Sequence, residues 1–244
     1  MRVIKPSIFP AGVCAAFSTR IGGVSPPPLG MNLSDRVGDD PERVKKNREL
    51  FFGGLGISLD RLAIPGQVHG MTVAKATLPG HYPKTDGLVT EERDVFLCVS
   101  AADCVPILLY DPVRQVVASV HAGWRGTATG IASAAIGVLT SEFGSRPSDI
   151  FVYIGPSASE CCYVVGQEVA ERFPSQFIRR KEDAFLVDLK GANRLLLLDA
   201  GVDTQKIEIS PFCTISDAHL FHSHRRDGNR AGRMMGVIGL TAQS

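Results

Sequence analysis

Three short segments of the chain contain side chains that can bind a metal ion or perform nucleophilic chemistry. His69 lies in the segment QVHG, Cys104 in ADCVP and His121 in VHAGWRG, and each reads as a strand end beside a tight turn. Catalytic zinc commonly takes three protein ligands from His, Cys and carboxylates and keeps a fourth position open. Two histidines and one cysteine meet that requirement. The segments are therefore candidates for a Zn²⁺ site formed by His69, Cys104 and His121.

Other interpretations of the same residues stay open, because their long separations match no compact zinc-binding pattern. His69 could simply bond to the backbone, and Cys104 could be an inert core thiol, since free cysteine is among the most buried residue types. Cys104 could also be a thiolate nucleophile with His121 as its base. That arrangement belongs to a hydrolase or amidase that needs no metal.

The run GWRG after His121 favours an anion site. Glycine lets a ligand approach the backbone closely, N–H groups at a helix start attract anions, and Arg125 can add a bidentate contact. We therefore expect phosphate at Arg125 and at the helix start near Thr127, with Arg20 and Arg225 as further candidates. The alternative is that Arg125 pairs with a nearby carboxylate and that Trp124 belongs to the core.

Short β-branched runs in the middle of the chain predict the strands that position these residues. Almost nothing between the runs has helical periodicity, so parallel βαβ crossovers do not fit, whereas antiparallel or mixed sheets do. Further strands are expected towards both ends. The expected strands cover residues 13–19, 68–74, 87–90, 95–100, 106–110, 116–120, 150–154, 207–212 and 234–240.

Caps and apolar periodicity indicate the helices. One helix begins at Pro41 behind the N-cap Asp40, and a long helix is expected over residues 127–143. A short helix is expected over residues 168–173, and another follows the cap residue Asp188. Strands bunched in the middle with helices scattered around them predict an α+β fold.

The composition is that of an ordinary globular protein, with 44% hydrophobic residues, 21% charged residues and a net charge of +1. This balance lacks the excess of positive charge that is typical of proteins that bind nucleic acid or an anionic membrane. No apolar run is long enough for a signal peptide or a membrane span, and the six cysteines contain no CxxC pair. With no repeat or linker, we expect one domain over residues 1–244, a cytoplasmic monomer with reduced thiols.

These segments are part of a wider pattern that resembles the YfiH family, also called the laccase-domain or multicopper polyphenol oxidoreductase family. VHAGWRG joined to an upstream ADC and QVHG is highly specific, and the further motifs follow in family order over nearly the whole chain. Where many relatives have tyrosine in an FFSYRRD-like segment, this chain has His222 and His224, and Ala231 replaces a family threonine. The further motifs are STRIGGVS, MNLS, GDDPERVKKNRE, IGPSASECCYVVGQEV and FHSHRRDGNRAGR.

The resemblance implies a single-domain sandwich of mixed or antiparallel sheets flanked by helices, likened to the catalytic domain of a CNF-like deamidating toxin with a Cys-His site. It implies metal at His69, Cys104 and His121, and a purine nucleoside phosphorylase for adenosine, inosine and methylthioadenosine that also deaminates adenosine. Two alternatives are copper-dependent oxidation of phenols and a Cys-His hydrolase for peptidoglycan precursor editing. Six histidines, only two of them in recognisable ligand motifs, are few for a multicopper oxidase.

The two nucleoside reactions need different groups. For deamination, zinc would lower the pKa of a water that attacks C6 of adenine, and Asp103 is the nearest candidate to move protons. The alternative role of Asp103 is to accept backbone hydrogen bonds in the turn before Cys104. For phosphorolysis, phosphate attacks C1′ while the purine leaves, which requires the candidate anion-binding residues.

Four side chains near these motifs are expected to have no part in the site. Cys161 and Cys162 are adjacent, so they cannot easily form a relaxed disulfide. They are interpreted as a buried thiol and a neighbour on the opposite face. His222 and His224 are expected to be solvated or to neighbour arginines.

Overall fold

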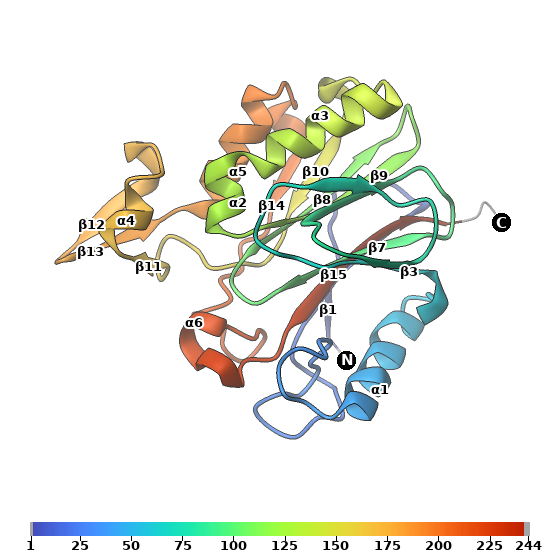
Figure 1. The fold of residues 1–244 in the computed structure, drawn as a ribbon, viewed down its shortest axis with the longest axis horizontal. Coiled ribbons are helices and arrows are strands. Elements are labelled where there is room, and N and C mark those ends of the chain that lie inside the picture. Colours follow the sequence, from blue (N-terminus) through green and yellow to red (C-terminus); the bar gives the residue numbers. More distant parts are fainter. Residues whose placement is uncertain (1, 242–244) are drawn as a thin grey trace.

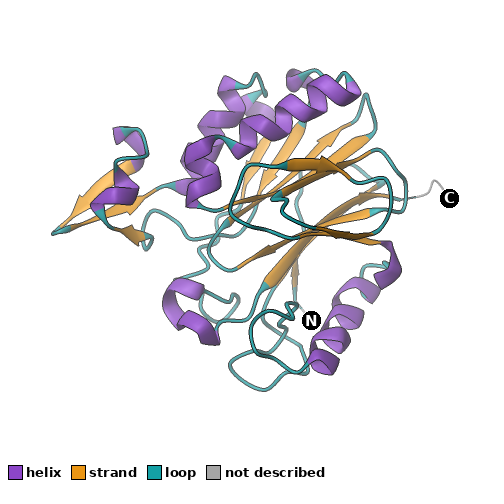
Figure 2. Ribbon diagram, in the orientation of Figure 1, coloured by secondary structure: helices purple, strands orange, loops and turns teal. Residues whose placement is uncertain are grey.

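The computed structural model describes residues 2–241 of the chain. Two six-stranded sheets pack face to face, and helices cover the outer face of each, so the layers run helix, sheet, sheet, helix (Figures 1 and 2). This confirms the α+β fold that the strand-rich middle predicts and the sandwich that the family resemblance implies. Residue 1 and residues 242–244 of the expected domain lie outside the described residues.

The first sheet joins the two ends of the chain. Its strand order is β1-β2-β15-β7-β3-β5, in which the first four strands are antiparallel and β3 pairs in parallel with both β7 and β5. The last strand of the chain thus lies between β2 and β7. The strands are β1 (Val3–Ile4), β2 (Val13–Ser18), β15 (Met234–Leu240), β7 (Phe96–Ala101), β3 (Leu62–Pro65) and β5 (Gly80–Tyr82).

The second sheet carries the other half of the sandwich. Its order is β14-β10-β8-β9-β6-β4, with antiparallel pairing in the centre and a parallel pair at each edge. Both large sheets are therefore mixed, as the lack of crossover helices indicates. The strands are β14 (Ile207–Ile209), β10 (Phe151–Ile154), β8 (Val105–Asp111), β9 (Val116–Ala122), β6 (Gly87–Thr90) and β4 (Val73–Lys75).

A small third sheet projects to one side of the sandwich (Figure 1). It consists of β11 (Val164–Val165), β13 (Ala184–Val187) and β12 (Ile178–Lys181), all antiparallel, with α4 (Gln167–Ala170) close by. The sequence pattern does not predict these strands, because runs of two to four residues carry too little alternation.

Alternation along β8 places its side chains in two different cores. Val105, Ile107 and Leu109 pack on the helix side of the second sheet, whereas Leu108 and Tyr110 pack between the two sheets. Every residue of β8 and β9 is buried. That explains why the sequence shows continuous apolar runs here, as for strands covered on both faces.

Helices cover the outer faces of the two large sheets. In Figure 1, α1 (Pro41–Gly53) lies on the first sheet, while α3 (Ile131–Phe143) and α5 (Leu189–Asp199) lie on the second. The predicted caps are confirmed: the side chain of Asp40 accepts from the Glu42 amide, and that of Asp188 accepts from the Gly191 amide. The last helix is α6 (His224–Asp227).

The prediction of a single helix over residues 127–143 is wrong. Two helices occupy this region, α2 (Trp124–Thr129) and α3, and the chain changes direction between them at Gly130. Gly130 has a φ of 89°, a left-handed conformation that glycine adopts without the steric cost of a Cβ. The break leaves only six residues in α2, so its dipole is weaker than that of the long helix expected from the pattern.

The strand expected over residues 68–74 is also wrong for most of its length. Residues 66–72 form a loop, and only β4 follows as a strand. Val68 is 55% exposed and Met71 is 49% exposed, so the apolar residues of this run do not face a core. The strand expected over residues 207–212 ends at Ile209. Within residues 2–241, the helices lack the length and apolar character needed to cross a membrane.

Candidate metal centre

His69, Cys104 and His121 meet at one end of the second sheet. Their ligand atoms all lie within 4.8 Å of one another. The Sγ of Cys104 is 4.0 Å from the Nε2 of His69, and the two imidazole rings lie edge to face with centroids 4.8 Å apart. The structure therefore brings together the three residues that the sequence predicts as a ligand set.

Strand pairing positions two of the three side chains. Cys104 directly precedes β8, and His121 is the next-to-last residue of β9. In the antiparallel register, Val105 lies opposite Ala122 and Pro106 lies opposite His121. Cys104 and His121 are thus brought to the same end of the sheet by the β8–β9 pairing.

Asp86, which sequence reasoning did not single out, holds the site together. Its carboxylate is fully buried, and Oδ1 lies 2.9 Å from the Nδ1 of His121. The same carboxylate accepts the backbone N–H groups of Val68, His69 and Gly70 at 2.8–3.1 Å. Its one sequence signal is its position just before β6, which pairs with β9.

The hydrogen bond to Asp86 also selects the tautomer of His121. When the carboxylate accepts from Nδ1–H, the Nε2 lone pair is free to face Cys104 and His69. A carboxylate behind a ligating histidine is a common feature of metal sites, where it fixes ring orientation and raises ligand basicity. The same Asp86 carboxylate accepts three hydrogen bonds from the backbone of residues 68–70 and so also positions His69.

Backbone strain in the loop is held by a side-chain clamp. Gln67 and His69 have positive φ angles of 37° and 61°, which non-glycine residues seldom adopt. The side-chain amide of Gln67 bonds the backbone of Ser100 as a neighbouring strand would. Its Nε2 donates to the carbonyl of Ser100, and its Oε1 accepts from the N–H of Ser100, both at 2.8 Å. This clamp ties the loop to β7. Strained backbone that is held in this way is typical of functional sites.

Gly123 lies directly against two of the three candidate ligands. A Cβ at this position would lie 2.9 Å from Cδ2 of His69 and 3.2 Å from Sγ of Cys104. Its φ of −70° is ordinary, so the need for glycine comes from close approach alone. The motif HAGWRG is thus explained in part by the space that the ligand set occupies.

Cys104 and His121 act on each other's ionisation. Burial by itself raises the pKa of the Cys104 thiol, but the charge and hydrogen bonds of His121 and His69 outweigh it and lower the pKa to about 6. Burial lowers the pKa of His121, whereas Cys104 and Asp86 raise it to about 9. The surroundings thus favour a negative sulfur and a positive charge beside it, which a metal cation can supply in place of the imidazole proton.

The three ligand atoms fit the dimensions of a tetrahedral metal site. Bonds of about 2.3 Å to sulfur and about 2.05 Å to nitrogen place those atoms roughly 3.6 Å apart. The observed 4.0 Å between Cys104 and His69 is within a small rotation of that value, and His69 is exposed enough to rotate. Because His69 is exposed and Cys104 half-buried, a fourth ligand has an approach from solvent.

Asp103 lies next to the ligand set, with both carboxylate oxygens already engaged. Oδ1 accepts from the hydroxyl of Thr214 at 2.7 Å, and Oδ2 accepts from the N–H of Arg225 at 2.6 Å. Its own carbonyl accepts from the N–H of Ala158. These contacts tie the turn before Cys104 to two distant segments of the chain, which favours the structural role over proton transfer.

The structure separates Arg125 from Thr127. Arg125 is exposed, and its guanidinium lies 4.2 Å from the ring centre of Trp124. Thr127 is only 3% exposed, and its hydroxyl accepts from the side-chain amide of Asn193 at 2.9 Å. Arg125 is thus open to solvent beside Trp124, whereas Thr127 is buried between its own helix α2 and α5.

Of the other two arginine candidates, Arg225 is nearer the ligand set. Its backbone bonds Asp103, its Nη1 donates to the Val164 carbonyl at 2.8 Å, and its guanidinium lies 5.0 Å from the ring centre of Tyr163. Arg20 instead donates from Nη1 and Nη2 to two backbone carbonyls, those of Ala218 and Pro28.

Arg233 is a further cation beside the site that sequence reasoning missed. Burial lowers the pKa of its guanidinium, and the nearby charges of Cys104 and Asp103 oppose that effect. The sequence feature that could have pointed to Arg233 is its place at the end of the FHSHRRDGNRAGR motif.

The remaining histidines and cysteines only partly match expectation. His222 is fully buried rather than solvated, and burial together with the charge of nearby Arg20 lowers its pKa to about 3. His224 is exposed, with Nδ1 3.1 Å from the carbonyl of Gly228. The interpretation of Cys161 and Cys162 as thiols on opposite faces is wrong, because their sulfurs lie 3.0 Å apart.

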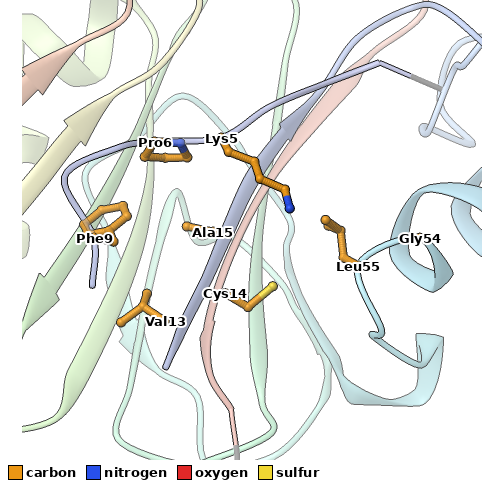
Figure 3. A pocket seen from close by; sticks show the side chains of 8 residues that line it. All are labelled: Lys5, Pro6, Phe9, Val13, Cys14, Ala15, Gly54 and Leu55. Atoms are coloured by element: carbon orange, nitrogen blue, oxygen red, sulfur yellow. The ribbon is translucent and has the colours of Figure 1, made fainter. Parts of the chain in front are cut away.

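A pocket of about 270 Å³ lies away from these residues, between the N-terminal segment, β2 and the end of α1 (Figure 3). Most of the residues that line it are apolar in type, and Lys5 and Cys14 are its chemically active side chains. Burial raises the pKa of the Cys14 thiol despite the charge of Lys5. Because none of the predicted site residues lines it, the ligand cluster is the stronger candidate site.

Known proteins resemble this chain over most of its length. Residues 14–241 match the family described as multi-copper polyphenol oxidoreductase laccase. The chain is 37% identical over 246 residues to purine nucleoside phosphorylase YlmD of Bacillus subtilis (strain 168), covering 93% of this chain and 88% of the relative. It is 40% identical over 230 residues to a purine nucleoside phosphorylase of Deinococcus radiodurans, covering 92% and 88%.

A solved structure has the same fold. The crystal structure of YlmD from Geobacillus stearothermophilus superimposes with a TM-score of 0.92 at 38% identity, covering 97% of this chain and 94% of that chain.

Proposed function

The chain belongs to the multi-copper polyphenol oxidoreductase laccase family, and from this premise we propose that it is a zinc-dependent purine nucleoside phosphorylase. The observation that carries the proposal is the convergence of His69, Cys104 and His121 on one point, with Asp86 behind His121. Relatives at 37% and 40% identity that bear the name purine nucleoside phosphorylase support the reaction class. We propose adenosine, inosine and methylthioadenosine as substrates, with deamination of adenosine as a second activity.

Zinc suits the donor set better than other common metals. Two imidazoles and one thiolate form a mixed nitrogen and sulfur set that favours tetrahedral Zn²⁺ with one open position. When bound, zinc supplies Lewis-acid chemistry at that position. Asp86 holds His121 in the ligating tautomer, and the Gln67 clamp on β7 holds the loop that presents His69.

Apolar and cationic groups beside the ligand set suit the two halves of a phosphorolysis reaction. Val68 and Met71 flank His69 and are 55% and 49% exposed, which provides an apolar surface for a purine ring. Arg125 stacks on Trp124, and Arg225 is bonded through its backbone N–H to Asp103. Each guanidinium can bind a phosphate oxygen. The phosphate oxygen forms a bond to C1′ as the C1′–N9 bond breaks, and the purine takes the electron pair.

A second candidate function rests on the ionisation of the site. The pKa of Cys104 near 6 and its contact with His121, which Asp86 orients, resemble the nucleophile, base and orienting group of a cysteine hydrolase. Such an enzyme, an amidase acting on peptidoglycan precursors for example, would form a covalent adduct on Cys104. It would need no metal.

Oxidation of phenols has less support from the residues. A multicopper oxidase needs several copper centres, with histidines as the main ligands. Within residues 2–241, two groups of side chains are close enough to hold a metal, and only one of them contains histidine.

The test is an activity panel on protein whose metal content is known. Protein purified without added metal should contain about one zinc per chain, as the single ligand set requires. It should cleave adenosine, inosine and methylthioadenosine only when phosphate is present, whereas deamination should proceed without phosphate. Several coppers and no zinc, together with oxidation of a phenol, would revive the oxidase.

Two cysteine variants test whether Cys104 is a metal ligand or a nucleophile. Cys104→Ser should lose both zinc and activity, and Cys14→Ser is the matched control because Cys14 lies in β2 outside the site. Chelation should inactivate the wild type. A substrate-derived adduct on metal-free, fully active protein would show that Cys104 is a nucleophile and would contradict the zinc assignment.

A further inference from the structure

Three thiols gather at a second place in the fold, apart from the His69–Cys104–His121 site. Cys161 and Cys162 lie between β10 and β11, and Cys213 follows β14 some fifty residues later. The sulfurs of Cys161 and Cys162 are 3.0 Å apart, and those of Cys161 and Cys213 are 3.9 Å apart. All three sulfurs lie within 4.8 Å of one another, and all three cysteines are free.

The fold builds this thiol cluster from two segments that are held side by side. Ser157 forms a parallel bridge with Cys213, and the Thr214 N–H donates to the Ser157 carbonyl at 3.0 Å. The N–H of Cys213 donates to the carboxylate of Asp217 at 2.9 Å, and Ser159 N–H points to the Cys213 sulfur at 3.4 Å. Cys213 is therefore fixed and buried, whereas Cys161 is exposed and Cys162 half-buried.

We propose that Cys161, Cys162 and Cys213 form a second metal site, which binds a soft, thiol-seeking ion of the Cu(I) type. Metal–sulfur bonds of about 2.3 Å in a trigonal site place the sulfurs roughly 4 Å apart. The 3.9 Å between Cys161 and Cys213 already has this value. The 3.0 Å between Cys161 and Cys162 opens when the exposed Cys161 side chain rotates.

The ligand chemistry separates Cu(I) from Zn²⁺ at this cluster. Thiolates select soft ions, and Zn²⁺ in an all-sulfur environment takes four ligands in a tetrahedron. In the described part of the chain, the group consists of three sulfurs without an imidazole or carboxylate member. Three thiolates suit a soft ion that accepts a coordination number of three.

A buried cation offsets part of the negative charge that three thiolates bring. Lys190 is 6% exposed, and its Nζ donates to the carbonyls of Ser210 and Phe212 at 2.8 and 2.7 Å. Phe212 is the residue directly before Cys213. The ammonium group thus lies against the segment that presents the buried thiol.

The thiol cluster is accessible from solvent through Cys161, so a metal ion can be delivered and removed without unfolding. It lies on segments that also support the first site, because Ala158 N–H bonds the carbonyl of Asp103 and Thr214 bonds its carboxylate. The proposal does not rest on the nucleoside reaction, since none of the three thiols belongs to the first ligand set.

The test is a Cu(I) titration of fully reduced protein under inert gas, in competition with bathocuproine disulfonate. The Cys104→Ser background removes the first site, so remaining Cu(I) reports the thiol cluster. We expect about one Cu(I) per chain in this background, by the single-cluster argument. Adding Cys161→Ser should weaken Cu(I) binding by more than the roughly 10–100-fold that loss of a supporting residue costs.

Control variants keep the result interpretable. Cys14→Ser in the same background should retain Cu(I), and Cys161→Ser with Cys104 intact should retain phosphorolysis. Cys161 is exposed, so its substitution tests the site even if Cys213→Ser does not fold. The proposal is overturned if the Cys104→Ser protein binds no Cu(I), if Cys161→Ser and Cys162→Ser leave Cu(I) affinity unchanged, or if Zn²⁺ displaces Cu(I) from the cluster at equal concentration.

Discussion

Replacing Asp86 by asparagine should weaken metal binding at His121 although Asp86 is not a ligand. In the wild type, Oδ1 serves His121 Nδ1 and the His69 N–H, and Oδ2 serves the N–H groups of Val68 and Gly70. An asparagine side chain has one acceptor oxygen and one NH₂ donor. Whichever way it is oriented, two of these four hydrogen bonds lose their acceptor.

The orientation that keeps the loop amides of Val68 and Gly70 satisfied is the damaging one for the metal. It points the NH₂ group at His121, which can then only accept at Nδ1. The proton moves to Nε2 and blocks the ligand atom. The opposite orientation keeps His121 in the ligating tautomer, but the N–H groups of Val68 and Gly70 then face a donor. That contact disturbs the loop that presents His69.

Asp86 contributes both to the stability of the fold and to the support of a metal ligand, and each contribution has its own magnitude. Burial raises the pKa of Asp86, but hydrogen bonds from His121 and the loop amides outweigh it and lower the pKa from 3.8 to about 2. At about 1.4 kcal/mol per pKa unit, this depression is worth roughly 2–3 kcal/mol to the stability of the folded, metal-free protein. Loss of a group that supports a metal ligand typically costs 10–100-fold in affinity, or roughly 1.4–2.7 kcal/mol.

The assay is competition for zinc against a chromophoric chelator, with the free energy of unfolding measured in parallel on metal-free protein. Asp111→Asn is the matched control: Asp111 is also fully buried and accepts two backbone N–H groups, those of Val113 and Arg114, at the far end of β8. It should lose stability but keep zinc affinity. Equal zinc affinity in Asp86→Asn and wild type, or equal loss in both variants, would refute the reasoning.

Three further outcomes follow from the site. Gly123→Ala should lower zinc affinity, because its Cβ would lie 2.9 Å from His69. Gly137→Ala on α3 is the control and should keep zinc affinity, because a Cβ there meets open space. Chelator competition measures the zinc affinity of both variants. Arg125→Ala should weaken phosphate use roughly 10-fold or more, the worth of a charge-assisted contact, and leave deamination and zinc content intact; unchanged phosphate dependence would transfer the role to Arg225. Metal-free protein should keep the stability contributed by Asp86 above about pH 4 and lose it as pH falls towards 2, since the folded pKa is depressed; acid unfolding of Asp86→Asn should lack this step.

Local patterns in the sequence were sufficient for the elements that bury apolar faces. The caps Asp40 and Asp188, and the strands 87–90 and 234–240, needed only side-chain chemistry and periodicity, and the structure confirms them. The three candidate ligand residues could also be named, because residue type and family-like motifs mark them without knowledge of distances. Their convergence required the β8–β9 register.

Other features depended on contacts between distant segments, which no local pattern encodes. Asp86 is marked in the sequence only by its place just before β6, and it matters because β6 pairs with β9 and brings it to His121. The thiol cluster joins Cys161 to Cys213 through the bridge at Ser157. The sequence by itself determined which side chains can do chemistry and which runs must be buried. The tertiary structure alone decided which of them share a site, because strand pairing sets distances between residues far apart in the chain.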